Sequence, residues 1–491
     1  MLRNSCFTQG FIRVCATAVM CGGMAASHAQ DGPSQNIIVM YRDQSPDTAE
    51  RARTAQIMSD STARLGIGLR EVRQMTNGAH VMSIDGHLTR AEIRQLVANL
   101  SADPNVEFAE EDASVQVVRS NKARVVQRIA DPPARNDAPV HAALVPNDPR
   151  YNEQWNYFDS RGGINLPAAW DLATGKGVFV ADLGTGYRPH ADLVQNIVGG
   201  YDFVTDLYRA NDGDGRDSSA LDPGDGYIGR QCPAIPSPPE ERDTRASWQG
   251  THSAGTIAAK TNNGVGVAGV AYDARLVPVR VMGRCGGSVA DASDAIAWAA
   301  GAPVTGVPVN TSPVKVMNLS FGFGRDECPR IMQQAIDTAR ARGTTVVVDA
   351  GYILQNASGY SPGNCKGVIV VAGLSRSGIG YQTNFGDVVD IAAPVGDSSD
   401  AASEQDLVLS TYNEGAQAPG ADSYQHREGF SAAPHVTGVV ALMYSVKPSL
   451  TPDQVESILK RTARPFVRPC NQCGAGVVDA AAAVAAAKAL P

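Results

Sequence analysis

The sequence predicts an α/β protein, with a parallel sheet flanked by helices, preceded by a small ferredoxin-like domain. From about residue 146, short apolar runs such as VFVAD, TTVVVDA and GVIVVAG alternate with helical stretches such as PRIMQQAIDTARA. Alternation at this spacing is typical of a parallel sheet with helices on both faces. Residues 36–112 follow a different order, β-α-β-β-α-β, which predicts a separate ferredoxin-like unit.

The first 29 residues are typical of a secretory signal peptide. Arg3 and Arg13 precede the apolar run VCATAVMCGGMAA, and Ser27 and Ala29 occupy the −3 and −1 positions of the expected cut. We therefore expect residues 1–29 to direct the chain to the periplasm or the medium. No later stretch approaches about 18 consecutive apolar residues, so no membrane span is expected. The net charge of −8 argues against nucleic acid as the main partner.

The small domain begins with a predicted strand at residues 36–41, NIIVMY, followed by a predicted helix over 47–63. Two strands, VRQMT and AHVMSI, come next. The segment TRAEIRQLVANLSAD is an amphipathic helix that places Leu96, Val97 and Leu100 on one face. The segment VEFAEED is the last strand of this domain.

Residues 113–145 are predicted to form an exposed linker, because Arg and Lys residues are scattered there among prolines and polar residues. The parallel-sheet domain is predicted over 146–491. Sites in such domains lie at the carboxyl ends of the strands.

The cysteines that remain after export predict disulfides. An even number in an exported chain favours three bonds, and the sequence leaves their pairing open. A C-x-x-C pair in a late loop favours one local disulfide, since no second pair with similar spacing completes a zinc site. The remaining cysteines are Cys232, Cys285, Cys328, Cys365, Cys470 and Cys473.

Several segments of the large domain resemble those of the subtilases, the subtilisin-like serine peptidases. They include GTHSAGTIAA, VMNLSFG, YSPGNCKGVIVVAG and AAPHVTGVVALM, and they occur in the family's order. Residues 36–112 resemble the family's propeptide, which folds the enzyme and blocks its cleft. The resemblance implies a subtilisin-like sheet and a cleft for peptide or protein ligands, with the chain's own propeptide as one partner.

Three catalytic positions of the family hold other residues in this chain. By the resemblance, Gly184 occupies the aspartate position, Gln249 the histidine position and Tyr352 the oxyanion asparagine position. A glutamine amide has no useful basicity at neutral pH. Asp182 lies on the same strand face as Gly184, about 6–7 Å back along the strand. His252 matches the family's structural second histidine, and a phenol at 352 could either donate a hydrogen bond or plug the cleft.

The serine position has two alternatives in the segment EGFSAAPH. Counted back from Pro434 without a gap, it is Phe430, and with one deletion after the serine it is Ser431. His435 follows four residues after Ser431, but it matches a family position that packs in the core. Ser431 remains a candidate nucleophile.

These departures predict a catalytically impaired subtilase, a pseudopeptidase that binds peptides or proteins or keeps its propeptide as a plug. In subtilisin itself, loss of the serine or histidine costs about 10⁶ in turnover, and loss of an oxyanion donor roughly 10²–10³. The alternative is an active serine endopeptidase that uses Ser431, with Asp182, in an atypical site.

The segment VMNLSFGFG aligns with the family strand that forms a wall of the substrate pocket. Ser320, Phe321 and Gly322 are therefore candidate substrate-binding residues, and this edge could bind an extended peptide by strand addition. The alternative is a plain core strand with a turn.

The loop 211–225, NDGDGRDSSALDPGD, is rich in aspartate. Carboxylates on a glycine-broken loop suit calcium, which subtilases often carry as a structural ion, so Asp212, Asp214 and Asp217 are candidate ligands. The alternative is a solvated acidic loop, because the distal glutamate of an EF-hand is missing.

Overall fold

The computed structural model describes residues 35–42, 59, 62, 66–117, 144–228, 231–232, 244–380, 383–397, 403–429 and 432–491. The predicted signal peptide and nearly all of the helix predicted over 47–63 lie outside these ranges, as do Phe430 and Ser431. Among the helices in these ranges, none is long and apolar enough to cross a bilayer.

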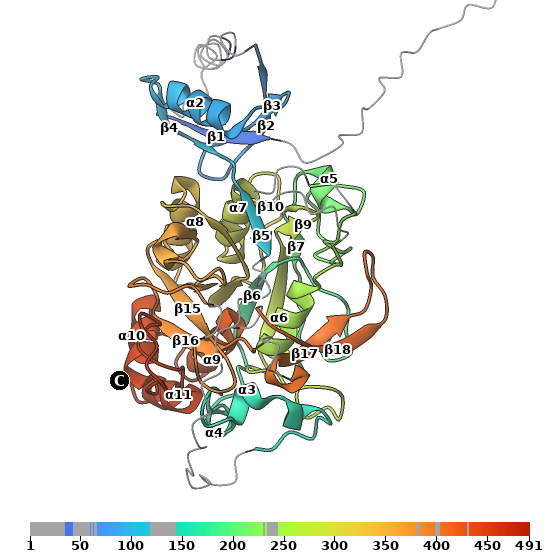
Figure 1. The fold of residues 1–491 in the computed structure, drawn as a ribbon, viewed down its shortest axis with the longest axis vertical. Helices are drawn as coiled ribbons and strands as arrows, with labels where there is room; N and C mark the ends of the chain where they lie inside the picture. The colour runs from blue at the N-terminus through green and yellow to red at the C-terminus, as the bar shows by residue number, and fades with distance from the viewer. Residues whose placement is uncertain are drawn as a thin grey trace, which may run out of the picture. The chain divides into compact units, whose positions relative to one another are not determined.

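A seven-stranded sheet forms the centre of the large domain, with helices around it (Figure 1). The order of its strands is β16-β15-β13-β11-β6-β8-β7. Every neighbouring pair in it is parallel, which confirms the predicted α/β class. The strands are β6 (Phe179–Gly184), β7 (Tyr201–Asp202), β8 (Arg275–Arg280), β11 (Val316–Leu319), β13 (Thr345–Asp349), β15 (Val368–Leu374) and β16 (Ile391–Pro394).

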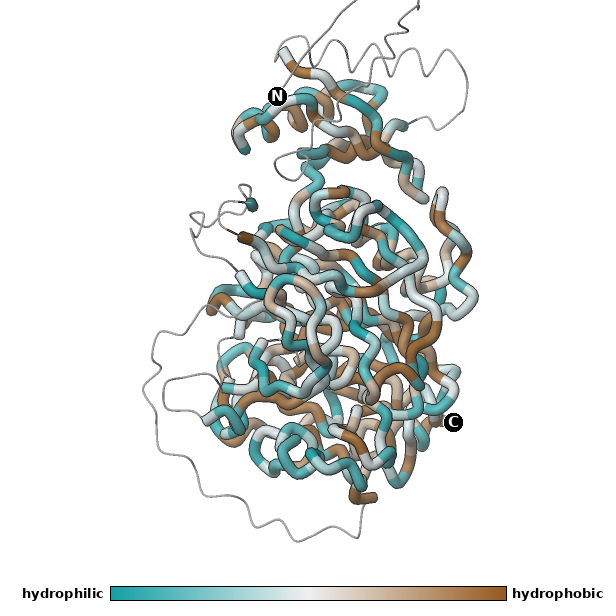
Figure 2. The backbone as a smooth tube through the Cα atoms, turned by 90° about the vertical axis from the view of Figure 1, so that its right-hand side faces the viewer, coloured by the Kyte–Doolittle hydropathy of each residue, from teal (hydrophilic) through white to brown (hydrophobic). Residues whose placement is uncertain are grey.

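Helices cover both faces of this sheet, and the strands feed two cores. In β13, Val346 and Val348 join the cluster that holds α7 and α8, whereas Val347 joins the cluster of α6, α9, α10 and α11. This alternation follows the period of two along a strand. Figure 2 shows brown apolar stretches interrupted by teal polar ones along the chain. The long helices are α6 (Gln249–Ala258), α7 (Val289–Ala299), α8 (Arg330–Ala341), α9 (Ala432–Val446), α10 (Pro452–Thr462) and α11 (Ala480–Lys488).

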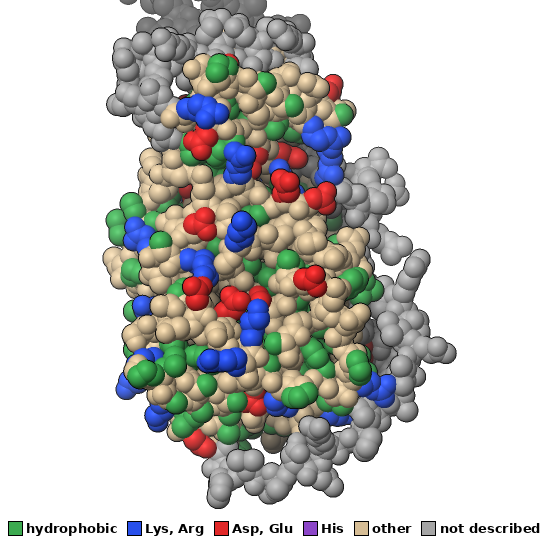
Figure 3. Space-filling model, turned by 90° about the vertical axis from the view of Figure 1, so that its left-hand side faces the viewer, with side chains coloured by type: hydrophobic (Ala, Val, Ile, Leu, Met, Phe, Trp, Pro, Cys, Tyr) green, Lys and Arg blue, Asp and Glu red, His purple; other side chains and the backbone are tan. Residues whose placement is uncertain are grey.

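Shorter elements surround the sheet. Strands β17 and β18 form an antiparallel hairpin that packs on α6. On the face drawn in Figure 3, blue Lys and Arg side chains are interspersed with red Asp and Glu side chains. These elements are α3 (Trp155–Phe158), α4 (Pro167–Trp170), α5 (Leu207–Ala210), β9 (Met282–Gly283), β10 (Gly286–Ser288), β12 (Phe321–Gly324), β14 (Tyr360–Ser361), β17 (Val408–Asn413) and β18 (Asp422–Arg427).

The N-terminal part folds as an antiparallel sheet in the order β2-β3-β1-β4, packed against α2. Leu96 and Leu100 of α2 are buried against this sheet and Val97 is partly buried, as the sequence predicts. Thr89 and Glu92 form a capping box that starts the helix. The elements are β1 (Asn36–Tyr41), β2 (Gly68–Gln74), β3 (His80–Asp85), α2 (Arg90–Ser101) and β4 (Val106–Glu111).

The predicted linker over 113–145 is wrong at its start. Ser114–Val117 form β5, the central strand of a second sheet in the order β14-β12-β5-β10-β9. Val115 is fully buried in this strand, although basic residues follow soon after. The run SVQV alternates polar and apolar residues, which suits a short strand that finds partners elsewhere in the chain.

The six cysteines pair as Cys232–Cys285, Cys328–Cys365 and Cys470–Cys473. These bonds confirm the prediction of disulfides, including the local bond of the C-x-x-C loop.

Candidate functional site

Gly184 and Gln249 face each other at the carboxyl end of the parallel sheet. Gly184 is the last residue of β6 and Gln249 is the first residue of α6. A Cβ atom built on Gly184 would lie 2.6 Å from Gln249 Oε1, so the amide occupies the space that a side chain at 184 would need. Gln249 is fully buried, and its Oε1 has no hydrogen-bond partner among the described residues. The two positions that the resemblance pairs as aspartate and histidine are therefore adjacent in space.

A close backbone approach fixes the start of α6 against the end of β6. A Cβ atom at Gly250 would lie 1.9 Å from Gly186 O, so only glycine fits there. The Gly250 N–H donates to Thr185 Oγ1 at 3.1 Å, and Thr185 Oγ1 donates to Asp222 Oδ2 at 2.6 Å. This arrangement explains why the glycine and threonine around the two altered positions are retained.

Asp182 lies behind Gly184 and is held by neutral donors. Ser253 Oγ donates to its carboxylate, and Asn318 Nδ2 donates to it at 2.7 Å. Burial raises the pKa of Asp182 to about 6. Gln249 Nε2 lies 3.4 Å from Ser253 Oγ, so the serine stands between the amide and the carboxylate.

The side chain of Tyr352 lies in the core that also contains the buried residues of α9. Its hydroxyl donates to Asp349 Oδ1 at 2.8 Å, and its side chain is 3% exposed. The same Asp349 oxygen accepts the Ala433 N–H at 2.9 Å, close to the start of α9. Burial raises the pKa of Asp349 to about 7. Tyr352 therefore supports the helix that follows the candidate serine, and its hydroxyl donor is already used.

We expect Asp349→Ala to lower the free energy of unfolding by about 2–4 kcal/mol, because it leaves two buried donors without an acceptor. Asp349→Asn keeps an acceptor oxygen and should cost clearly less. Urea unfolding at pH 7 measures both changes. Equal losses for the two variants would contradict this role for the Asp349 oxygen.

The histidines that the structure describes in the large domain have partners away from Gln249. His252 Nε2 donates to Val408 O at 3.1 Å, and burial lowers its pKa to about 3. His435 Nε2 lies 2.8 Å from Asn156 Nδ2, and its ring meets that of Tyr157 edge to face. These two histidines serve the core. The other two are His190, which donates to Ser423 O, and His426, which lies near Glu153 and Glu404.

Residues 430 and 431 lie outside the described ranges, so the serine alternatives stay predictions. The chain is anchored on both sides of them. Gly429 N–H reaches Val395 O at 3.4 Å, and Ala432 is fully buried at the start of α9.

The predicted substrate edge carries a strand from the same chain. Phe321 pairs with Val117 and Gly322 with Gln116 in antiparallel register, and β10 pairs with the other side of β5. Gly322 allows Tyr360 to pack closely, since a Cβ atom at 322 would lie 2.3 Å from the phenol ring. The Phe321 side chain is fully buried and belongs to the core.

Ser320, the third residue predicted at this edge, is 3% exposed. Its Oγ accepts from Asn318 Nδ2 at 2.5 Å, the same amide nitrogen that donates to Asp182. A chain of polar contacts therefore runs from the Gln249 amide through Ser253, Asp182 and Asn318 to this edge.

The predicted calcium ligands do not converge on one point. Asp212 forms an ion pair with Arg280 Nη1 at 2.6 Å, Asp217 Oδ1 accepts the Ser219 N–H at 2.7 Å, and Asp214 is exposed. No group of three or more His, Cys, Asp or Glu side chains suited to a metal occurs in the described part of the chain. As placed here, the residues of this loop do not fit calcium.

Two aspartates of the same loop serve the site instead, which the sequence pattern does not predict. Asp222 is 1% exposed and accepts from Thr185, and Asp225 accepts from Ser247 Oγ at 2.8 Å, just before α6. Burial and the neighbouring Asp225 raise the pKa of Asp222 to about 7. In the sequence, the tight DPGD turn distinguishes Asp222 and Asp225 from the other aspartates of the loop, because their spacing differs from that of the open DGDG repeat before them.

Comparisons with known proteins agree with this arrangement. The Subtilase family matches residues 175–476. The "Extracellular protease" of Xanthomonas campestris pv. campestris is 45% identical over 464 residues, which cover 92% of this chain and 73% of that protein. The "Extracellular basic protease" of Dichelobacter nodosus is 36% identical over 96% of this chain and 74% of its own length.

Solved structures are similar as well. A protease structure from Pseudoalteromonas arctica has a TM-score of 0.67 and 52% identity, covering 70% of this chain and 99% of its own. Fervidolysin from Fervidobacterium pennivorans has a TM-score of 0.62 at 22% identity, over 93% of this chain and 62% of its own, and shows the fold alone. With the matched segments, the parallel sheet and the paired positions 184 and 249 in agreement, this chain belongs to the subtilase family of serine peptidases.

Proposed function

We propose that this chain is an exported subtilase homologue with impaired catalysis, whose cleft binds extended peptide strands. Its own residues 114–117 act as the resident strand, and residues 36–112 act as a retained propeptide. The extracellular relatives support export. The peptide-binding role is supported by β5, which adds to the edges of β10 and β12.

The pair Gly184–Gln249 carries the proposal of impaired catalysis. A serine hydroxyl needs a base to take its proton and a carboxylate to orient that base. Here the amide of Gln249 and the glycine at 184 occupy the two facing positions. The distance between Gln249 Oε1 and a Cβ atom built on Gly184 is 2.6 Å. Neither can accept a proton at neutral pH.

Contacts of the N-terminal part with the large domain support a retained propeptide. Arg73 pairs with Asp291 at 2.9 Å and with Asp294 at 2.5 Å, both on α7. Glu110 accepts two backbone N–H groups at the start of α8, and Asp112 accepts one at the start of α7 at 2.9 Å. Carboxylates at helix N-termini are favourable, so these residues hold β5 in place.

The names of the relatives favour the alternative, an active serine endopeptidase using Ser431. Comparing the chain with its Ser431→Ala variant separates the two proposals. We expect equal rates of hydrolysis of a chromogenic peptide, because no activated nucleophile is present. A rate that Ser431→Ala abolishes would establish the alternative.

The strength with which the N-terminal part docks on the large domain should depend on pH. Burial raises the pKa of Asp112 from 3.8 to about 6 in the docked state, and burial also raises that of Glu110. A carboxyl whose docked pKa is raised binds protons on docking, so docking tightens as pH falls from about 6 to about 4 and is weakest above 6. Asp291, whose pKa is lowered to about 2 with Arg216 and Arg73 beside it, stays charged throughout.

We therefore expect a labelled peptide with the sequence of residues 114–120 to bind about fivefold more weakly at pH 5 than at pH 7, since the resident strand competes better. Fluorescence anisotropy measures this binding. Asp112→Asn should reduce the difference. Tighter peptide binding at pH 5 would contradict the assignment.

A further inference from the structure

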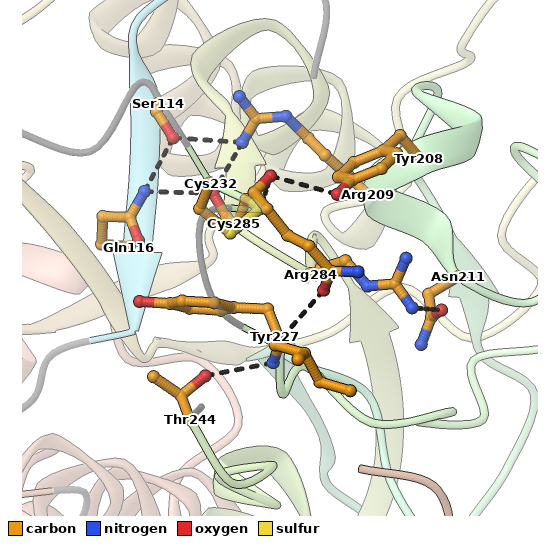
Figure 4. The surroundings of a disulfide bond; sticks show 12 residues. Ser114, Gln116, Tyr208, Arg209, Asn211, Tyr227, Cys232, Thr244, Arg284 and Cys285 are labelled. Atoms are coloured by element: carbon orange, nitrogen blue, oxygen red, sulfur yellow. Dashed lines mark hydrogen bonds between the residues drawn. A yellow bond between two sulfur atoms is a disulfide. The ribbon is translucent and has the colours of Figure 1, made fainter. Parts of the chain in front are cut away.

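The edge of the cleft that meets the first residue of β5 is built around a buried arginine. Ser114 pairs with Ser288 of β10, and its Oγ accepts from Arg209 Nη1 at 3.1 Å. Gln116 Nε2 also donates to Ser114 Oγ, at 2.8 Å. The hydroxyl at this position is therefore surrounded by donors, as Figure 4 shows.

Arg209 is fixed before any peptide arrives. It lies on α5, where Asp206 Oδ1 accepts its backbone N–H at 3.0 Å. Its Nη1 donates to Cys285 O at 3.0 Å and to Gly287 O at 2.9 Å, both at the strand edge that pairs with β5. The disulfide Cys232–Cys285 ties this edge to Cys232, which is distant in the sequence (Figure 4). The guanidinium is thus part of a rigid rim, not a free surface side chain.

The charge of Arg209 is poorly compensated. The residue is 8% exposed, and the acceptors of its Nη1 are a hydroxyl and two carbonyls. Within the described residues it forms no ion pair. Burial lowers its pKa, and only at longer range do Asp206, Asp112 and Asp291 oppose this effect. A buried cation without a carboxylate is costly, and charge-assisted hydrogen bonds are about twice as strong as neutral ones.

We propose that Arg209 makes the position of Ser114 an acid-selective subsite, so that the cleft favours extended peptides with Asp or Glu there. This inference rests on the proposed peptide-binding function and names its sequence preference. In the register of β5, the selected residue lies three positions before the one that pairs with Phe321. Ser114 then binds this subsite with moderate affinity, because it accepts one hydrogen bond from Arg209 but does not neutralise the charge of the guanidinium.

Amide hydrogen exchange of β5 in the full-length chain tests the subsite. We expect Ser114→Asp to slow exchange of the residue 115–117 amides about tenfold, and Ser114→Lys to speed it, because only the first pairs with Arg209. In an Arg209→Met chain the Asp variant should lose its advantage over serine. Arg209→Lys, which keeps the positive charge, should retain part of that advantage.

The exchange rates distinguish a failure of the acid-selective subsite from a failure of peptide binding. If Ser114→Asp changes exchange equally with and without the Arg209 charge, the acid-selective subsite is overturned while peptide binding stands. If the β5 amides exchange at the rate of an unstructured chain in the unaltered protein, the cleft holds no strand and the proposed function itself fails.

Discussion

Replacing Gly184 by Asp and Gln249 by His together is expected to raise peptide hydrolysis by about 10³-fold or more. The reason is that the two positions face each other and the surrounding contacts of Thr185 and Gly250 are in place. In subtilisin, the aspartate alone is worth about 10⁴ in turnover and the histidine about 10⁶. The gain here is smaller because Tyr352 supplies no oxyanion donor.

Each single change should do little. Asp at 184 alone would place its Cβ atom 2.6 Å from Gln249 Oε1, and His at 249 alone has no carboxylate to orient it. The rate is measured with a chromogenic peptide in chains that also carry Val115→Asp, so that the cleft is free. Ser431→Ala in the same background is the control, and activity that survives it would show that the gain does not come from the restored triad.

Val115→Asp is expected to raise the affinity for an added peptide of residues 114–120 about 100-fold. Val115 is fully buried in the main core beside residues of β9 and α7, and a carboxylate there costs about 3 kcal/mol. The variant therefore drives β5 out of the cleft while the large domain stays folded. Anisotropy of the labelled peptide measures the affinity.

Val72→Asp is the matched control for this prediction. It adds the same charge to the N-terminal part at a residue that is 36% exposed, so the peptide affinity should not change. An unchanged affinity in Val115→Asp would mean that β5 does not compete with added peptides.

Much of the fold is predictable from the sequence because it follows from local patterns. The continuous apolar run TTVVVDA predicts a strand buried on both faces, as Val346, Val347 and Val348 show, and the pairing of Gly184 with Gln249 is what the resemblance to the subtilases implies. The α2 face is equally clear, since helical period and side-chain type agree there.

The remaining features depend on contacts between distant segments. No local signal shows that Ser114–Val117 pairs with residues about 170 and 200 positions away. The resemblance implies that Tyr352 lies at the oxyanion position or in the cleft, yet its hydroxyl donates to Asp349 beside α9. Composition predicts one acidic loop, although Asp212 pairs with Arg280 while Asp222 supports Thr185. The roles of these residues depend on burial and on which residue each one contacts. Composition contains no information about either.

The intact mass of the exported chain, with and without a fluorophosphonate probe, tests the central claim most directly. We predict a chain that still carries residues 36–143 and takes up no probe, because the pair Gly184–Gln249 cannot activate a serine. A chain that begins near residue 146 and carries one adduct, lost in Ser431→Ala, would contradict this prediction and show that another group replaces the missing base.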